Sequence, residues 1–102
     1  MNEIHVTGRV VEAGPRNYYA AKMRHELVVE TYDAQSGANR HAVFYGYTAA
    51  EVALIEPLSA GMDVEVYARL GCRLSNGRWF VQAVPFRVDS WGGEGEGGGN
   101  DG

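Results

Sequence analysis

The sequence has little of several features that would each indicate a class of protein. It holds a single cysteine, Cys72, so no disulfide can form within the chain, which fits a reducing compartment. No apolar run approaches the roughly 18 residues of a membrane-spanning helix. The first residues, MNEIHVTGRVVEAG, have neither the basic nor the long apolar segment of a signal peptide. We therefore expect a cytoplasmic protein that has no membrane segment.

Residue patterns for metal binding or catalysis are scarce as well. The histidines His5, His25 and His41 match no spacing of a metal site, and no cysteine pair supports them. Cys72 has no recognisable His and Asp arrangement around it, and no serine or threonine lies in a nucleophile motif. The expectation is a protein with no metal, no cofactor and no enzymatic activity.

Composition and charge are those of one small globular domain. The chain has 102 residues, 45% of them hydrophobic, and a net charge of −4. Glu94, Glu96 and Asp101 lie in the last eleven residues, and without them ten acidic side chains stand against nine basic ones. Eight of those nine are arginine, which suits phosphate contacts and base stacking. A nearly neutral body of this kind can bind nucleic acid with weak long-range steering.

Apolar and polar residues alternate in the way that predicts β-strands. The predicted strands are 3–13, 24–32, 40–47, 62–70 and about 78–89. Gly8 inside the first strand suggests a bulge or a sharp bend, and Pro85 in the last one marks an edge or an irregularity. Residues 14–23 open with Gly-Pro and are predicted to form a loop. The turn at Ser75-Asn76-Gly77 is typical of a tight hairpin.

The same alternation predicts which side chains are buried. The expected core residues of the strands are Leu27, Val29, Ala42, Phe44, Met62, Val64, Val66, Ala68 and Leu70. Tyr45 and Tyr47 fall on the outer face of the third strand, and Glu26 and Glu30 on the outer face of the second. Rings placed outside a core are available to a ligand, although a tyrosine can also pack against a neighbouring strand.

One helix is predicted between the third and fourth strands. Thr48 is a suitable N-cap, and Glu51 three residues later completes a capping box. Val52 and Ile55 are the expected buried residues of the helix, which Pro57 ends. Five strands with this one helix give an all-β fold, the OB-fold, a five-stranded Greek-key barrel that binds oligonucleotides or oligosaccharides on one face. Residues 1–91 form this domain, and the Gly-rich acidic segment 92–102 is predicted to be a disordered tail.

Several stretches are similar to one known family. NEIHVTGRVV is similar to the family's opening strand, VFYGYTAAEVA to its strand-to-helix junction, and LSAGMDVEVYARL to its fourth strand. On these motifs, residues 2–91 resemble the bacterial or phage-type single-stranded DNA-binding protein family, SSB. The resemblance implies an OB-fold that coats single-stranded DNA with little sequence preference in replication, repair or recombination. It also implies a homodimer or homotetramer associated with the nucleoid.

The resemblance transfers one residue specifically and departs elsewhere. Tyr45 stands where the family has a base-stacking aromatic before a junction glycine, here Gly46. Asn39 or Arg40 occupies the place of a frequent tryptophan, and the family's long hairpin between the last two strands is here only LSNGR. The acidic–hydrophobic tip that docks partner proteins in the family is absent, so partners recruited through the tail are not expected.

Candidate binding residues are rings that could stack on bases and cations that could contact phosphates. They are Tyr45, Tyr47, Tyr18, Tyr19, Arg16, Lys22, Arg24, Arg40, Arg73, Arg78 and Phe80. Trp79 is expected in the core because Val81 and Ala83 share its face.

Two glutamates oppose a nucleic-acid ligand. Glu26 and Glu30 should lie on the same side of the sheet as Tyr45, where carboxylates repel phosphates. Three explanations remain open: the glutamates lie off the binding path, they pair with Arg24 or Arg40, or binding is weak. The clusters of Arg16 with Lys22 and of Arg73 with Arg78 nonetheless favour single-stranded DNA as the ligand, with RNA as a variant. The alternative is an OB-fold accessory subunit that binds protein, because aromatic residues and arginine are also enriched at protein interfaces.

Overall fold

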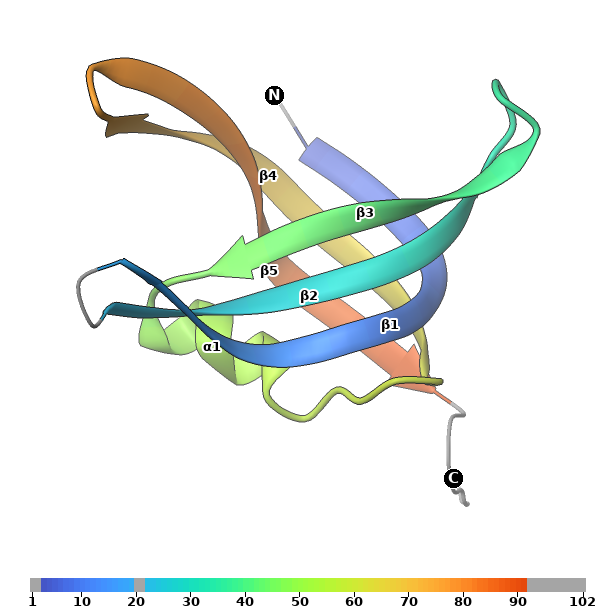
Figure 1. Cartoon of the computed structure of the whole chain (residues 1–102). Coiled ribbons are helices and arrows are strands. Elements are labelled where there is room, and N and C mark those ends of the chain that lie inside the picture. Colours follow the sequence, from blue (N-terminus) through green and yellow to red (C-terminus); the bar gives the residue numbers. More distant parts are fainter. Residues whose placement is uncertain (1–2, 20–21, 92–102) are drawn as a thin grey trace.

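The computed structural model describes residues 3–19 and 22–91, so the predicted tail 92–102 lies outside the described residues. Within them the chain forms five strands and one helix in the predicted order (Figure 1). The elements are β1 Glu3–Tyr19, β2 Lys22–Asp33, β3 Ala38–Gly46, α1 Ala49–Ile55, β4 Asp63–Ser75 and β5 Arg78–Trp91.

The five strands form a single curled antiparallel sheet in the order β3-β2-β1-β4-β5, and β3 lies against β5, so that the sheet curls into a barrel (Figure 1). Strand β1 belongs to both halves, because it pairs with β4 from Glu3 to Arg9 and with β2 from Arg9 onward. Gly8 lies where the partner changes, and a Cβ there would stand 2.1 Å from the carbonyl oxygen of Glu30. The bend predicted at Gly8 is thus the corner of the barrel.

The core is filled by the predicted faces of the strands. Its buried residues are Val10, Leu27, Val29, Phe44, Ile55, Leu58, Val64, Val66 and Ala68. Ala42 and Met62 pack against this cluster while partly buried. Leu70 was expected in the core but is 40% exposed, because β4 runs past the end of the barrel at that point.

Helix α1 begins and ends as the sequence predicts. The Thr48 hydroxyl accepts a hydrogen bond from the Glu51 N–H, and the Glu51 carboxylate accepts one from the Thr48 N–H, which completes the capping box. Ile55 is fully buried and Val52 partly so. No helix among the described residues is long and apolar enough to cross a membrane.

The predicted loop at 14–23 is wrong. Strands β1 and β2 continue as a paired hairpin until Tyr19 and Lys22, so only residues 20–21 separate them. Gly14 adopts a φ of 154°, which a glycine reaches without strain, and the chain stays extended through Pro15, which pairs with His25. The pairing shifts register between Val10 and Glu12 and again between Asn17 and Tyr19. These irregularities let the strand continue through Gly14-Pro15, where the sequence predicted a break.

The last two strands extend beyond the barrel as a two-stranded hairpin, residues 70–83, here called the arm (Figure 1). Among the described residues, the pairing of β1 with β4 extends no further along β4 than Arg69, which lies opposite Glu3. The tip is the predicted tight turn, with Asn76 at φ 52° and Gly77 at φ 74°. The turn is as short as LSNGR suggested, but the hairpin is long, since its strands pair from Leu70–Ala83 out to Ser75–Arg78.

Replacing Gly8 by alanine should destabilise the domain by about 1–3 kcal/mol, because the added Cβ would clash with the backbone of β2. Urea unfolding measures the loss. The matched control is Gly71→Ala, where the nearest heavy atom to a Cβ lies at 3.8 Å, and stability should stay level or rise. Equal losses in both variants would contradict the assignment of Gly8 as the corner.

Candidate nucleic-acid interface

Tyr45 lies near the end of β3 on the outside of the barrel, and its ring is partly exposed. The guanidinium of Arg24, from β2, lies 4.4 Å from the centre of the ring. Arg24 also donates to the carboxylate of Glu26 from Nε at 3.0 Å and from Nη2 at 2.8 Å. Arg24, whose side chain is 19% exposed, covers one face of the ring. A ring and a positive charge therefore lie at one place, which is what a base with its phosphate requires.

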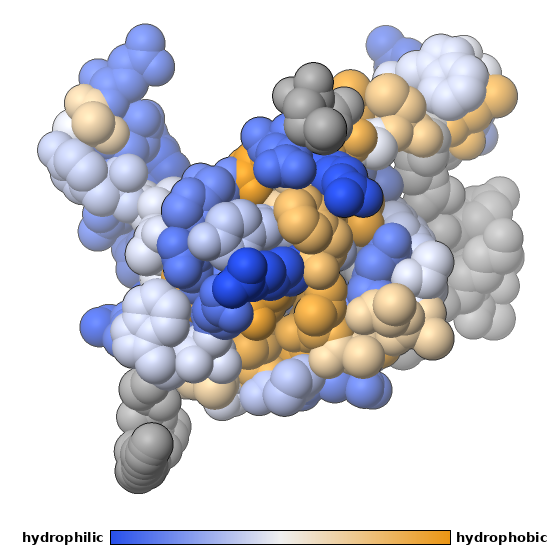
Figure 2. All heavy atoms as spheres, turned by 180° about the vertical axis from the view of Figure 1, so that it is seen from behind, coloured by the Kyte–Doolittle hydropathy of each residue, from blue (hydrophilic) through white to orange (hydrophobic). Residues whose placement is uncertain are grey.

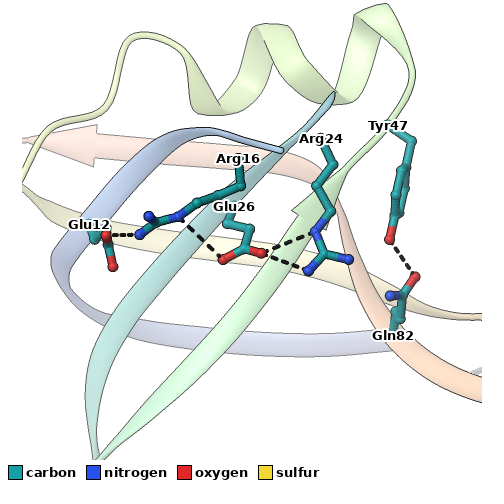
Figure 3. A network of polar contacts seen from close by, with 6 residues as sticks. All are labelled: Glu12, Arg16, Arg24, Glu26, Tyr47 and Gln82. Atoms are coloured by element: carbon teal, nitrogen blue, oxygen red, sulfur yellow. Dashed lines mark hydrogen bonds and ion pairs between the residues drawn. The ribbon is translucent and has the colours of Figure 1, made fainter. Parts of the chain in front are cut away.

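Glu26 is compensated by two arginines (Figure 3). It pairs directly across the ladder with Tyr45, which confirms that it shares the outer face. Besides Arg24, Arg16 approaches it with Nε 3.8 Å from Oε1, and Arg16 also forms an ion pair with Glu12. The four side chains alternate in charge and sum to zero, so Glu26 presents no uncompensated negative charge beside Tyr45.

The charge of Arg24 is secure in this network. Partial burial alone would lower the pKa of Arg24, but hydrogen bonds to Glu26 and Tyr47 outweigh it and raise the pKa above its usual value. Arg24 therefore remains a cation at any pH at which the protein is folded.

Tyr47 joins the end of β3 to the base of the arm. Its hydroxyl donates to Oε1 of Gln82 on β5 at 2.8 Å (Figure 3). Its N–H donates to Oε1 of Glu51 at 2.8 Å. The ring is partly exposed. A tyrosine held in this way fixes the position of the arm relative to Tyr45.

The arm adds exposed rings and a cation to the same side. Figure 1 shows the arm and the β1–β2 hairpin on the side of the barrel where β3 ends. Arg78 and Phe80 are exposed, Phe80 by 47%. Trp79 is 69% exposed, so its predicted core position is wrong: alternation identified its face, but no barrel lies beneath that part of β5.

The other predicted residues are placed only in part. Tyr18, Tyr19 and Lys22 occupy the last positions of β1 and the first of β2, and Arg73 lies in β4, but the side chains of all four lie outside the described residues.

Arg40 and Glu30 are not part of the network around Tyr45. Arg40 lies toward the start of β3, away from Tyr45, and donates to the Ser36 hydroxyl at 3.2 Å. Glu30 is exposed and pairs across the ladder with His41.

A shallow open depression lies at the far end of the barrel from Tyr45. Its lining residues are Thr7, Gly8, Arg9, Glu30, Asn39, Asp63 and Trp91. Arg9 pairs with Asp63 at 3.5 Å, and Glu30 adds a second carboxylate. The excess of negative charge does not suit a phosphate.

The sequence reasoning missed a cluster of rings on the outer face of β1, β4 and β5. His5 stacks on Tyr67 with ring centres 4.5 Å apart, Arg87 lies 5.1 Å from the Tyr67 ring centre, and Arg69 lies 4.5 Å from that of Phe86. Burial, with Glu65 nearby, raises the pKa of Tyr67. Alternation places Tyr67 and Arg69 outward, but only the pairing register brings His5 and Arg87 beside Tyr67.

No group of three or more histidine, cysteine or acidic residues suited to a metal ion occurs in the described ranges.

Comparisons with known proteins support the fold. No protein-family model and no curated protein matches the sequence. Among solved structures, the chain is similar to the dimeric N-terminal domain of PriB protein from Thermoanaerobacter tencongensis, with a TM-score of 0.60 and 12% sequence identity. The match covers 89% of this chain and 97% of that one. Together with the curled five-stranded sheet and the helix between β3 and β4, this establishes the OB-fold predicted from the sequence.

Tyr47→Phe should lower the free energy of unfolding by about 0.5–1.5 kcal/mol, because Gln82 loses its hydrogen-bond donor and Arg24 loses the hydroxyl to which it bonds. Chemical denaturation measures the change. Tyr32→Phe is the control, since the Tyr32 side chain is 64% exposed and its loss of a hydroxyl should have little effect. An unchanged stability of Tyr47→Phe would mean that the contact with Gln82 does not hold the arm.

Proposed function

We propose that this protein binds single-stranded DNA with little sequence preference, without catalytic activity, and protects unpaired strands during replication, repair or recombination. The observation that carries the proposal is the pairing of Tyr45 with Arg24 on the outer face of β2 and β3. This is the face that OB-folds use for oligonucleotides, together with the loops that correspond to the β1–β2 hairpin and the arm.

The electrostatics support a ligand held more by stacking than by net charge. The chain carries −4 overall, and the Glu12, Arg16, Glu26 and Arg24 network is neutral. Stacking contributes roughly 1–3 kcal/mol per base and depends little on sequence, because every base has a π face. RNA offers the same faces, so the proposal covers it as a variant.

A homo-oligomer belongs to the proposal. One barrel offers a short path for a strand, and several copies raise the affinity through effective concentration. The similar PriB domain is described as dimeric, which supports a dimer here. The resemblance to the SSB family favours a dimer or a tetramer. The resemblance to this family also favours association with the nucleoid.

A second candidate function is an accessory subunit that binds another protein. The exposed apolar residues of the arm, such as Leu74 and Val81, favour it. Titration with oligo-dT at low and high salt separates the two, since a protein-binding subunit gives no quenching of tyrosine and tryptophan fluorescence at any oligonucleotide length.

Tyr45→Ala should weaken oligo-dT binding by about 1–3 kcal/mol and leave the melting temperature nearly unchanged. The physical reason is loss of a partly exposed ring that contributes little to the core. The control is Tyr32→Ala on β2, a more exposed tyrosine outside the network. If both variants bind alike, Tyr45 contributes no more than another exposed tyrosine of β2, and the pair of Tyr45 with Arg24 does not hold the strand.

Glu26→Gln should strengthen oligo-dT binding severalfold at low salt and steepen its salt dependence, since Arg24 then faces phosphates without its carboxylate partner and Arg16 keeps only Glu12. Glutamine keeps an oxygen that can accept from Arg24. Glu56→Gln makes the same change of charge at the exposed C-cap of α1 and serves as the control. A gain of equal size in both variants would assign the effect to net charge alone.

A further inference from the structure

The two faces of the arm differ in chemistry. One face carries Phe80, Arg78 and Gln82, of which Gln82 contacts Tyr47. The opposite face continues the buried side of β4 beyond Ala68 and is called here the apolar arm face. Its residues are Leu70, Cys72, Leu74, Trp79, Val81 and Ala83, which pair as Leu70–Ala83, Cys72–Val81 and Leu74–Trp79. Directly paired residues of an antiparallel ladder share a face, so the six form two adjoining rows.

This face is open to solvent. Leu74 is 55%, Trp79 69% and Val81 63% exposed, and Cys72 is exposed as well. In Figure 2 the arm lies at the upper right and carries hydrophobic residues. The exposed fractions correspond to an apolar patch on the order of 400 Å², within the range of the largest patches on monomeric proteins, which are often functional.

The composition of the apolar arm face indicates which kind of partner it binds. None of its six side chains carries a charge, so it has no cation for a phosphate and does not suit nucleic acid. The segment 92–102 of this chain does not suit it either, because it consists of glycine, acidic residues and one asparagine. The matching surface is uncharged and apolar.

We infer that the apolar arm face packs against the same face of a second copy of this chain. A two-fold axis across the arm sets the rows antiparallel, with the large Trp79 opposite the small Ala83, Leu74 opposite Leu70, and Cys72 opposite its own copy. The largest residue, Trp79, then meets the smallest, Ala83, and no like charges face each other. This inference deepens the homo-oligomer of the proposed function and rests on it.

The size of the face sets the strength of the pairing. Two copies bury about 800 Å² in total, below the roughly 1,200–2,000 Å² of stable interfaces and in the range of weak ones. The dimer is therefore concentration-dependent, with a dissociation constant in the micromolar range or weaker. Binding of both copies to one strand of DNA would raise its population.

The test is sedimentation velocity without DNA, over about 1 to 500 µM protein. The wild-type protein should shift from one chain to two, whereas Val81→Glu should raise the dissociation constant at least about 10-fold, because a carboxylate must be buried in an apolar contact. Val11→Glu makes the same substitution at an exposed valine of β1 and should dimerise like the wild type. Melting temperatures show whether the variants fold.

A second readout keeps the inference testable if Val81→Glu does not fold. Cys72 is the only cysteine and lies in the middle of the apolar arm face. Its reaction rate with Ellman's reagent should fall as the wild-type concentration rises through the dimer transition. A rate independent of concentration, a wild type that stays a single chain, or a Val81→Glu variant that dimerises normally would each overturn the inference.

Oligo-dT binding of the same variants separates this inference from the proposed function. Loss of the dimer in Val81→Glu with binding of a short oligonucleotide retained supports the apolar arm face as the contact between copies. A wild type that dimerises but binds no oligonucleotide overturns the DNA-binding function and leaves the arm contact standing.

Discussion

Strand β1 has to pair with β4 along its first half and with β2 along its second, and the chain can do so only by turning sharply at Gly8. The approach of β2 leaves no room for a side chain there, since a Cβ would lie 2.1 Å from the Glu30 carbonyl oxygen. The turn carries the second half of β1 away with β2, as the hairpin beside Tyr45. The face around Tyr45 therefore depends on this corner, whereas the arm extends at the other end of the β1–β4 pairing, where β4 continues past Glu3, the first described residue of β1.

On the outer face of β2 and β3, arginines compensate the acidic residue that would repel the anionic ligand of the proposed function. Glu26 lies beside Tyr45, but it holds Arg24 over the ring and draws Arg16 toward the same place. Its negative charge therefore positions two cations that would otherwise move freely on long side chains. The cost is competition with phosphate, which favours a protein that binds by stacking and by several copies over one that relies on a strong positive field.

The strands, the capped helix and the turn at Asn76-Gly77 followed from the sequence because each depends on neighbours in the chain. Leu27, Phe44 and Val66 were assigned to the core by alternation alone. The core position predicted for Trp79 was wrong because alternation tells only which face a residue takes. Whether a core lies under that face depends on where the described part of β1 begins, at Glu3 opposite Arg69. The contact of Arg24 with Tyr45 and the stacking of His5 on Tyr67 depend on register between distant strands, which no local pattern contains.

Where strands extend beyond a barrel, both of their faces are exposed to solvent. On β4 the apolar alternation of Val64, Val66 and Ala68 continues through Leu70 and Leu74 after the core has ended. A hairpin that needed only to reach a ligand would have polar residues on this side, because exposed apolar edges and faces promote association. The retained alternation is therefore a structural reason to assign a protein contact to one side of the arm, while Phe80 and Arg78 lie on the other side, where the proposed function places the DNA strand. One hairpin can then join two copies and hold their ligand, which gives a small domain the longer binding path that a single barrel lacks.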